Sequence, residues 1–589
     1  MGNIHQQRVE LLRSLMRAKG WDAVVITGSD PHSSEYPAER WKQVRWLSGF
    51  TGEAGDIVVT LDHAGLWTDT RYFIQAISQL EGSGIELHKT RVPEQVLIPE
   101  WLGQQFDGDT PVIAVDSLCV GADFAASLPG DIVGVPDLLE RFWTDRPSIP
   151  QTPIFTADPG ESRLEKIEWL RSFAASRDCD GILLSALDEI AWTLNVRASD
   201  IEYNPLVISY LLITGESVSW YVLKDGEDDP QTEATFSILS AAGIELLPYS
   251  DIQLLATEFE GRLFVDASTL NYHIYSCLLD SSIAVEEGSS PVALRKAVKN
   301  PVEVEGFRKV HLQDGLAMER FLYWLEKTVE SGREISEWDA AVMLGKLRAD
   351  IPGYRGDSFE TISAYGPGAA LPHYITPHED APKLRECGLY LCDSGGQYDC
   401  GTTDITRTVP LGPCTALEKE DYTLVLKCHI DLAMAVFPEG TPGCRLDILA
   451  REPLWKNKRN FGHGTGHGVG WFLGVHEGPH ELRQNLNDVP FRPGMVVTDE
   501  PGIYREGRHG IRHENVLLCV EAGESEFGRW LAFEPLTYCH FDTGAVIPEL
   551  LTEEEREWLN SYNRRVYETL APQLPAPIAG WLREKTQAI

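Results

Sequence analysis

The sequence has no run of 18 or more apolar residues, and it has comparatively few basic residues. The missing apolar run argues against a helix that spans a bilayer. Lys and Arg number 51 against 89 Asp and Glu, which gives a formal net charge of −38. Because such a field repels polyanions and acidic membranes, we expect neither nucleic acid nor a membrane as a partner.

Paired cysteine motifs are also missing, because none of the 11 cysteines forms a Cys-x-x-Cys pair. An odd number without regular spacing is typical of reduced, mostly buried thiols, and it disfavours a disulfide framework or a thiolate metal site. The first residues lack the basic and then apolar profile of a secretory signal. We therefore expect a cytoplasmic protein.

The chain is too long for one hydrophobic core, and its pattern predicts three domains. Helical spacing over residues 6–19, followed by the β-rich run DAVVIT, recurs as a helix over 164–176 followed by DGILLS. This repeat predicts two related α/β domains, 1–155 and 156–300, with a Pro-rich linker between them. Residues 301–589 start with a long amphipathic helix and continue with short β runs and further helices, which predicts an α+β domain.

The first predicted hairpin of this third domain carries two carboxylates, in LYLCDSGGQYDCGTTDITRT. A turn centred between Tyr398 and Asp399 would place Asp393 directly opposite Asp404 on one face. Two like charges that face each other are destabilising unless a cation lies between them. The alternative, at this point, is a pair of solvated turn acids in a slightly shifted register.

A second predicted hairpin, PGMVVTDEPGIYREGRHGIRHENVLLCV, repeats the arrangement. Pairing centred on Gly507 would place Glu500 opposite Glu514. Asp499 would point to the other face because side chains alternate along a strand. Two hairpins that each stack a pair of carboxylates are hard to explain as surface decoration.

Three histidines, His463, His467 and His476, lie in the glycine-rich segment FGHGTGHGVGWFLGVHEG. His463 and His467 have the spacing of ligands on one helical face, but glycine costs about 1 kcal/mol per residue in a helix. We therefore expect a loop or strand that approaches a ligand closely. A single histidine is most often structural, but three in one such loop favour a site.

Together these side chains predict a dinuclear metal site. Four carboxylates and one neutral histidine contribute −4, which two divalent ions balance. A carboxylate-rich set suits Mn²⁺, with Co²⁺ or Zn²⁺ as competitors. Two such ions can activate a shared water and polarise a substrate carbonyl, which is hydrolase chemistry.

The quoted segments resemble those of the M24 or pita-bread metallopeptidases, and among them the three-domain Xaa-Pro aminopeptidases (aminopeptidase P). The resemblance rests on DSGGQYDCGTTDITRT, HGTGHGVGWFLGVHEG, TDEPGIY and GIRHENV, and it extends through SEYPAERWKQVRWLSGFTGEAG, WTDTRYF, ALDEIAWTLNVRASDIEYNP and AVKN. It implies two creatinase N-terminal-like α/β domains followed by a pita-bread catalytic domain. It also implies release of the N-terminal residue from peptides with proline in the second position, and a homodimer formed through the N-terminal domains.

Carried over residue by residue, the resemblance implies five metal ligands: Asp393, Asp404, His467, Glu500 and Glu514. Asp404 and Glu514 would bridge the two ions, and the nucleophile would be a hydroxide between them. Glu500 would also act as the general base that passes a proton to the leaving proline nitrogen.

The resemblance also implies residues on the substrate side. His373, His463 and His476 match family histidines that lie near the scissile bond, bind the carbonyl oxygen or hold the proline residue. Arg512, which we group with them, would support a ligand carboxylate. One departure is His513, where relatives usually carry an apolar residue; alternation points it away from Glu514, so we expect little effect on metal binding.

Three other functions remain open at this point. A prolidase would cleave only Xaa-Pro dipeptides, and a creatinase-type enzyme would use no metal. A pita-bread domain can also become a binding scaffold without activity. The complete ligand set argues against the last two functions, and the two additional α/β domains argue against the first.

Overall fold

The computed structural model describes residues 3–223 and 229–589, and the chain divides into two compact units between Val292 and Ala293. The finer predicted boundaries, at residues 155 and 300, stay predictions. Within the described ranges, no helix combines the length and the apolar character needed to cross a bilayer. All 11 cysteines are free, as the sequence predicted.

The first unit opens with a mixed sheet in the strand order β4-β3-β2-β1-β5-β6. These strands are β1 (Ala23–Ile26), β2 (Asp56–Thr60), β3 (Ala64–Thr68), β4 (Glu86–Lys89), β5 (Val112–Asp116) and β6 (Asp131–Val135). The helices with them are α1 (Ile4–Lys19), α2 (Gln43–Ser48), α3 (Phe73–Gln79), α4 (Ile98–Gln105) and α5 (Ala122–Ser127). The central strand β1 is buried along its whole length because helices cover the sheet, which explains its unbroken apolar run AVVI.

A second sheet in the same unit has the equivalent order, β12-β11-β10-β8-β13-β14. Its strands are β8 (Gly181–Leu184), β10 (Ser209–Thr214), β11 (Val218–Val222), β12 (Glu245–Pro248), β13 (Arg262–Val265) and β14 (Ala284–Glu287), beside a short pair β7 (Phe155–Thr156) and β9 (Val196–Arg197). Its helices are α6 (Arg163–Ser176), α7 (Leu187–Leu194), α8 (Pro230–Ala241), α9 (Leu255–Glu258) and α10 (Tyr272–Leu279), and α11 (Pro291–Ala297) spans the boundary between the units. In both sheets the first strand pairs antiparallel with the second and parallel with the fifth, so the predicted repeat is confirmed.

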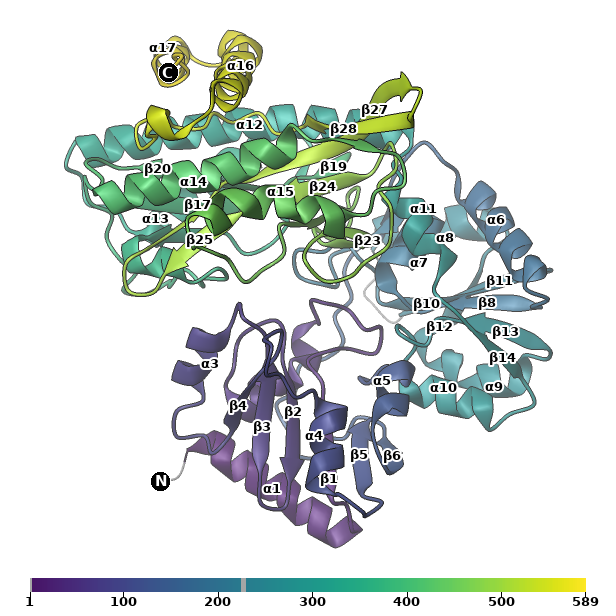
Figure 1. Ribbon diagram of the computed structural model, residues 1–589. Coiled ribbons are helices and arrows are strands. Elements are labelled where there is room, and N and C mark those ends of the chain that lie inside the picture. The colour runs from purple at the N-terminus through teal and green to yellow at the C-terminus, as the bar shows by residue number, and fades with distance from the viewer. Residues whose placement is uncertain (1–2, 224–228) are drawn as a thin grey trace. The chain divides into compact units, whose positions relative to one another are not determined.

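The second unit is α+β, as expected. Its long first helix begins at Pro301 because Asn300 caps it and Glu303 completes a capping box. The helices are α12 (Pro301–Glu330), α13 (Glu337–Ala349), α14 (Ala416–Ala433), α15 (Gly443–Lys456), α16 (Glu553–Leu570) and α17 (Ala576–Lys585). Figure 1 shows α14 and α15 lying side by side across strands of the largest sheet.

The largest sheet of the second unit is antiparallel and has the order β21-β28-β27-β24-β22-β23. Its strands are β21 (Val436–Pro438), β22 (Gly466–Gly468), β23 (Glu477–Leu482), β24 (Val496–Asp499), β27 (Asn515–Ser525) and β28 (Gly528–Pro535). A two-stranded ladder, β25 (Gly502–Arg505) with β26 (His509–Arg512), extends the hairpin of β24 and β27. Both ladders pair residues about Gly507, so the predicted register of this hairpin is confirmed: Asp499 lies opposite Asn515 and Gly502 opposite Arg512.

The register predicted for the other hairpin is wrong by two residues. Asp393, on β17 (Leu389–Ser394), lies opposite Thr406, on β20 (Ile405–Pro410), and not opposite Asp404. The reason is the turn, which is made by Asp399 and Cys400 between β18 (Gly396–Tyr398) and β19 (Gly401–Thr402). A slip of two residues preserves the face, so the two aspartates remain on one side of the hairpin. The neighbouring strands are β15 (Tyr354–Asp357) and β16 (Ile362–Tyr365).

Candidate metal centre

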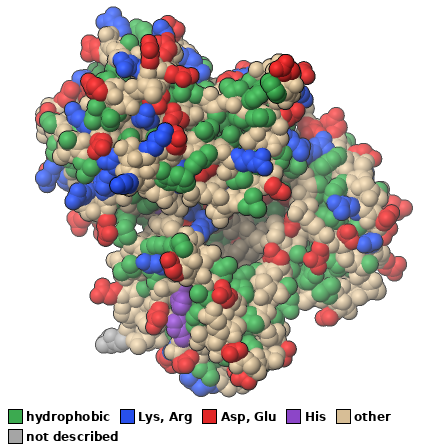
Figure 2. Space-filling view, in the orientation of Figure 1, with side chains coloured by type: hydrophobic (Ala, Val, Ile, Leu, Met, Phe, Trp, Pro, Cys, Tyr) green, Lys and Arg blue, Asp and Glu red, His purple; other side chains and the backbone are tan. Residues whose placement is uncertain are grey.

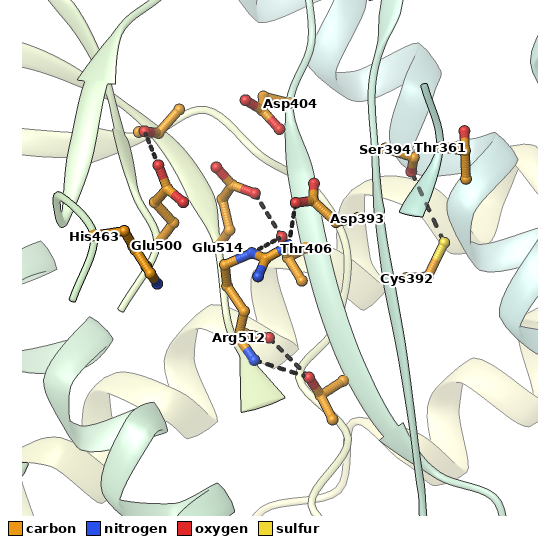
Figure 3. Close-up of polar contacts among 12 residues, drawn as sticks. Thr361, Cys392, Asp393, Ser394, Asp404, Thr406, His463, Glu500, Arg512 and Glu514 are labelled. Carbon is orange, nitrogen blue, oxygen red and sulfur yellow. Dashed lines mark hydrogen bonds and ion pairs between the residues drawn. The ribbon is translucent and has the colours of Figure 1, made fainter. Parts of the chain in front are cut away.

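Four carboxylates and one histidine from separate elements of the second unit converge at one place. The ligand atoms of Asp404, His467 and Glu514 all lie within 4.8 Å of one another. The Nε2 atom of His467 lies 3.4 Å from Oδ2 of Asp404 and 3.6 Å from Oε1 of Glu500. Figure 3 shows Asp393, Asp404, Glu500 and Glu514 around a common space.

The side chains of the cluster are positioned by the strands at whose ends they lie. Glu500 directly follows β24 and Glu514 directly precedes β27, so the two carboxylates face each other where the ladder opens. His467 reaches them because β22 lies tightly against β24. A side chain at Gly466 would come within 1.9 Å of the carbonyl oxygen of Thr498, so only glycine permits this approach. The segment is a strand and not a helix, as predicted, but the close approach at Gly466 is to a neighbouring strand and not to a ligand.

Arg512 is buried beside the acidic cluster. Its guanidinium donates to Asp393 Oδ2, to Thr406 Oγ1 at 3.1 Å and to the hydroxyl of Tyr504 at 2.7 Å. Thr406 in turn donates to Oε2 of Glu514 at 2.7 Å. The side chain of Arg512 therefore contacts one of the predicted ligand carboxylates directly, as expected.

Tyr504 extends this hydrogen-bonded chain to His463. Its hydroxyl lies 2.8 Å from Nε2 of His463, while Nδ1 of the same ring lies 2.7 Å from the carbonyl oxygen of Gly464. Burial is the main cause that raises the pKa of Tyr504 to about 12, so the phenol remains protonated. Burial, and then the charge of Arg512, lowers the pKa of His463 well below its usual range. A neutral ring with its proton on Nδ1 satisfies both contacts.

The structure brings the other two predicted histidines to the same region. The rings of His467 and His476 are nearly perpendicular, with centroids 4.2 Å apart. His373 follows a short 3₁₀ turn, Gly366–Ala370, and lies near enough to His463 that a positive charge on it would lower the pKa of that ring. The roles of these two histidines stay predictions.

Residues His476 to His480 read H-E-G-P-H, which matches the letters of a helical zinc-protease signature. Here Glu477 to His480 belong to strand β23, which begins just after His476, and Glu477 is buried against the ammonium groups of Lys299 and Lys296, with Lys296 Nζ at 3.1 Å. His480 is buried with its Nε2 atom 2.8 Å from the carbonyl oxygen of Val496. The segment therefore supports the loop of His476 and is no second metal site.

His513 points away from the cluster, as alternation predicted. Its ring is fully buried between Tyr422 and Phe541, with centroid distances of 4.5 and 5.7 Å. Both ring nitrogens are buried without a hydrogen-bond partner among the described residues, and burial lowers the pKa of His513 well below its usual range, so the imidazole packs here as a neutral ring. The departure at this position therefore leaves the acidic cluster unchanged.

The electrostatics of the cluster fit bound cations. Burial first, and then the charge of Asp393, raises the pKa of Asp404 to about 8. Burial raises the pKa of Glu500 to about 7 and that of Glu514 well above its usual range. Oδ1 of Asp393 is buried without a hydrogen-bond partner among the described residues. Carboxylates held this closely resist ionisation, and two divalent ions would relieve that cost.

Thr406, Tyr504 and the Lys–Glu–Lys group are site residues that sequence reasoning missed. Thr406 had a signal, because it shares a strand face with Asp404 by the period of two. Tyr504 had none, since its partners lie 8 and 41 residues away along the chain. Arg407 was also missed; it is buried and donates to the carbonyl oxygen of Glu514 at 2.5 Å.

Comparison with known proteins identifies the family. Residues 305–521 match metallopeptidase family M24, and residues 529–589 match the C-terminal region of that peptidase family. Over 98% of its length the chain is 37% identical to aminopeptidase P1 of Arabidopsis thaliana, and the match covers 98% of that protein. The chain belongs to metallopeptidase family M24.

Further matches of this M24 peptidase cover its whole length. Residues 8–138 and 145–303 each match a creatinase/prolidase N-terminal domain. The chain is 38% identical to a probable Xaa-Pro aminopeptidase P of Tuber melanosporum over 99% of both proteins. The chain also matches the crystal structure of an X-prolyl aminopeptidase from Caenorhabditis elegans, which is described as a cytosolic enzyme with a di-nuclear active site. The TM-score is 0.92 and the identity 35%, and the match covers 99% of this chain and 100% of that one.

These matches confirm two expectations. The fold consists of creatinase N-terminal-type α/β domains followed by a pita-bread M24 domain. The resemblance to the three-domain Xaa-Pro aminopeptidases, first noted on short segments, holds over the full chain.

Proposed function

We propose that this M24 peptidase is a metal-dependent Xaa-Pro aminopeptidase, which releases the N-terminal residue from peptides with proline in the second position. One observation carries the proposal: relatives with that name match 98–99% of the chain, including both N-terminal α/β repeats. By contrast, an Xaa-Pro dipeptidase from Bacillus anthracis matches 64% of this chain at 25% identity and a TM-score of 0.51. The additional length therefore favours the aminopeptidase over the prolidase.

Two divalent ions would be held by the five convergent side chains: Asp393, Asp404, His467, Glu500 and Glu514. Mn²⁺ suits this oxygen-rich set best, with Co²⁺ and Zn²⁺ as competitors. When bound, such ions lower the pKa of water and polarise the scissile carbonyl. Because two positive ions would cancel the charge of four carboxylates, they would also stabilise the folded second unit.

The protein groups divide the remaining work. Glu500, whose buried carboxyl has a pKa of about 7, would accept a proton from water and deliver it to the leaving proline nitrogen. Arg512 would hold Asp393 in place. Both ring nitrogens of His463 already have partners, so this histidine would use its ring surface, unless Tyr504 or Gly464 releases it.

Two further histidines are proposed to act on the substrate side. His373 and His476 would contact the peptide near the scissile bond, since His476 lies beside His467 of the cluster and His373 lies near His463. The acidic site suits the ammonium group of a free N-terminus. A bond before proline is a tertiary amide without an N–H, so general peptidases handle it poorly and a dedicated site is needed.

We also propose the remaining sequence-based expectations. The protein would act as a homodimer in the cytoplasm, and its domains would span 1–155, 156–300 and 301–589. Free cysteines throughout, and a cytosolic relative of equal length, support the cytoplasm.

Substrate choice tests the proposal most simply. The purified chain should cleave arginine from Arg-Pro-Pro peptides with added Mn²⁺ and lose this activity with EDTA. Turnover of Gly-Pro alone would instead identify a prolidase, and no hydrolysis with any divalent metal would indicate a binding scaffold.

A pair of matched variants tests the role of Glu500. Glu500→Gln should abolish turnover, because the amide cannot take up the proton. Glu506→Gln, an exposed position in the same hairpin, should remain active. Normal activity of Glu500→Gln would refute the assigned role.

A further inference from the structure

Two histidines of the first unit lie close to each other and to a carboxylate. All three residues are distant in sequence from the proposed catalytic cluster. His63 lies in the turn between β2 and β3, and His88 lies on β4, next to the exposed Glu86. The Nε2 atoms of the two rings are 3.0 Å apart, and one ligand atom from each of the three side chains lies within 4.8 Å of the others. Figure 2 shows histidine at the visible surface over β3 and β4.

Strand register explains why these groups meet. In the parallel ladder of β3 and β4, Gly65 lies opposite Glu86 and Trp67 lies opposite His88. Because side chains alternate along a strand, His63 is on the same face as Gly65 and Trp67. The three potential ligands therefore share one face of the sheet.

The position of the His88 ring depends on Gly65, which has no side chain. A Cβ atom at Gly65 would lie 2.7 Å from Cδ2 and 2.8 Å from Nε2 of His88, closer than such contacts normally occur. The imidazole thus lies across the glycine to reach His63. Trp67 stacks on the other part of the ring, at 3.9 Å and 11°, and is itself held by a hydrogen bond of 2.9 Å to the carbonyl oxygen of Val96.

The separation of the ring nitrogens suits a metal ion. With bonds of about 2.0–2.1 Å, two imidazole nitrogens lie about 2.9 Å apart at a right angle and about 3.3 Å apart at the tetrahedral angle. The observed 3.0 Å falls between these values, so neither ring would have to move far. Burial also lowers the pKa of both His63 and His88, that of His88 to about 4, which keeps the nitrogen lone pairs available at neutral pH.

We propose that His63, His88 and Glu86 form a surface site for one borderline divalent ion, with Cu²⁺ bound more tightly than Zn²⁺. Imidazole ligands favour these ions over Mn²⁺, and affinity rises toward Cu²⁺ in the usual order. The site would be independent of the catalytic cluster and of the proposed peptidase function. It would tie the β2–β3 turn to β4.

The test uses the full-length protein loaded with Mn²⁺ and titrated with Cu²⁺. Bound Cu²⁺ should show coupling to two imidazole nitrogens in electron paramagnetic resonance spectra. Because His467 also lies beside another imidazole, that of His476, the variants below are needed to assign the signal to His63 and His88. Metal analysis after dialysis should find one Cu²⁺ per chain at this site.

Three variants complete the test. His63→Gln with His88→Gln should lose the two-nitrogen signal and this Cu²⁺ equivalent. Gly65→Val should lose both as well, although it keeps every ligand, because its side chain would displace the imidazole of His88. His378→Gln should retain both; His378 is an exposed histidine stacked on Trp338, with Glu360 at 3.9 Å, and thus a matched His–Glu pair without a second histidine.

The proposal is overturned if the two-nitrogen signal persists in the double variant, or if the parent protein shows none. The contact between His63 and His88 is then a simple N–H···N hydrogen bond. Circular dichroism and peptidase activity should remain at the parent level in all three variants, which separates loss of the site from loss of the fold.

Discussion

Replacing Arg512 should destabilise the protein strongly, and more so without metal than with it. Its side chain is 3% exposed and makes hydrogen bonds to Asp393, Thr406 and Tyr504. Removing one partner of a buried ion pair costs about 3–5 kcal/mol, because the other charge is left without compensation. In the presence of EDTA, Arg512→Met should therefore lower the free energy of unfolding by about that amount.

Bound cations should reduce the loss. Two divalent ions near Asp393 would provide the compensating charge that the variant lacks, so excess Mn²⁺ should narrow the gap between variant and parent. Urea unfolding followed by tryptophan fluorescence, with EDTA and with Mn²⁺, measures both gaps. Arg508→Met is the control, since Arg508 is an exposed residue of the same hairpin. An unchanged urea midpoint in EDTA, or an equal loss under both conditions, would refute this reasoning.

Three further predictions concern the same site. In EDTA the protein should be less stable at pH 9 than at pH 6. The pKa values of Asp404 and Glu500 are raised to about 8 and about 7, so the folded state binds more protons than the unfolded state. The stability that this proton binding contributes is lost as the pH rises through these values. Urea midpoints that rise with pH would contradict this. Thr406→Val removes the hydrogen bond of 2.7 Å to Glu514 and should weaken Mn²⁺ binding by about 10–100-fold in calorimetric titrations; unchanged affinity would argue against the contact. Tyr504→Phe removes the hydroxyl that links Arg512 to His463. It should lower kcat/KM by about 10-fold, the equivalent of one hydrogen bond, with an unchanged circular dichroism spectrum. Full activity would show that the phenol is dispensable.

The sequence predicted which acidic residues and histidines lie together better than it predicted strand register and long-range contacts. The register about Gly507 was correct because both flanking strands extend regularly from one symmetric turn. The other hairpin was misplaced by two residues, since a glycine-rich turn gives no strong signal for its centre. The prediction that both aspartates share a face survived, because a slip of two residues leaves the face unchanged.

Other features could not be predicted from local pattern. The contacts of Tyr504 and of Lys299 depend on segments that approach only after folding. The role of Gly65 depends on the position of the imidazole of His88 on a neighbouring strand. Periodicity identifies which face a residue occupies, but it does not identify the distant partner that this face meets.

The most direct test of the metal centre is anomalous diffraction from crystals grown with Mn²⁺. Our account predicts two manganese peaks among Asp393, Asp404, His467, Glu500 and Glu514, about 3.5–4 Å apart. Carboxylates that turn away from one another, or no manganese among them in metal-saturated crystals, would contradict it.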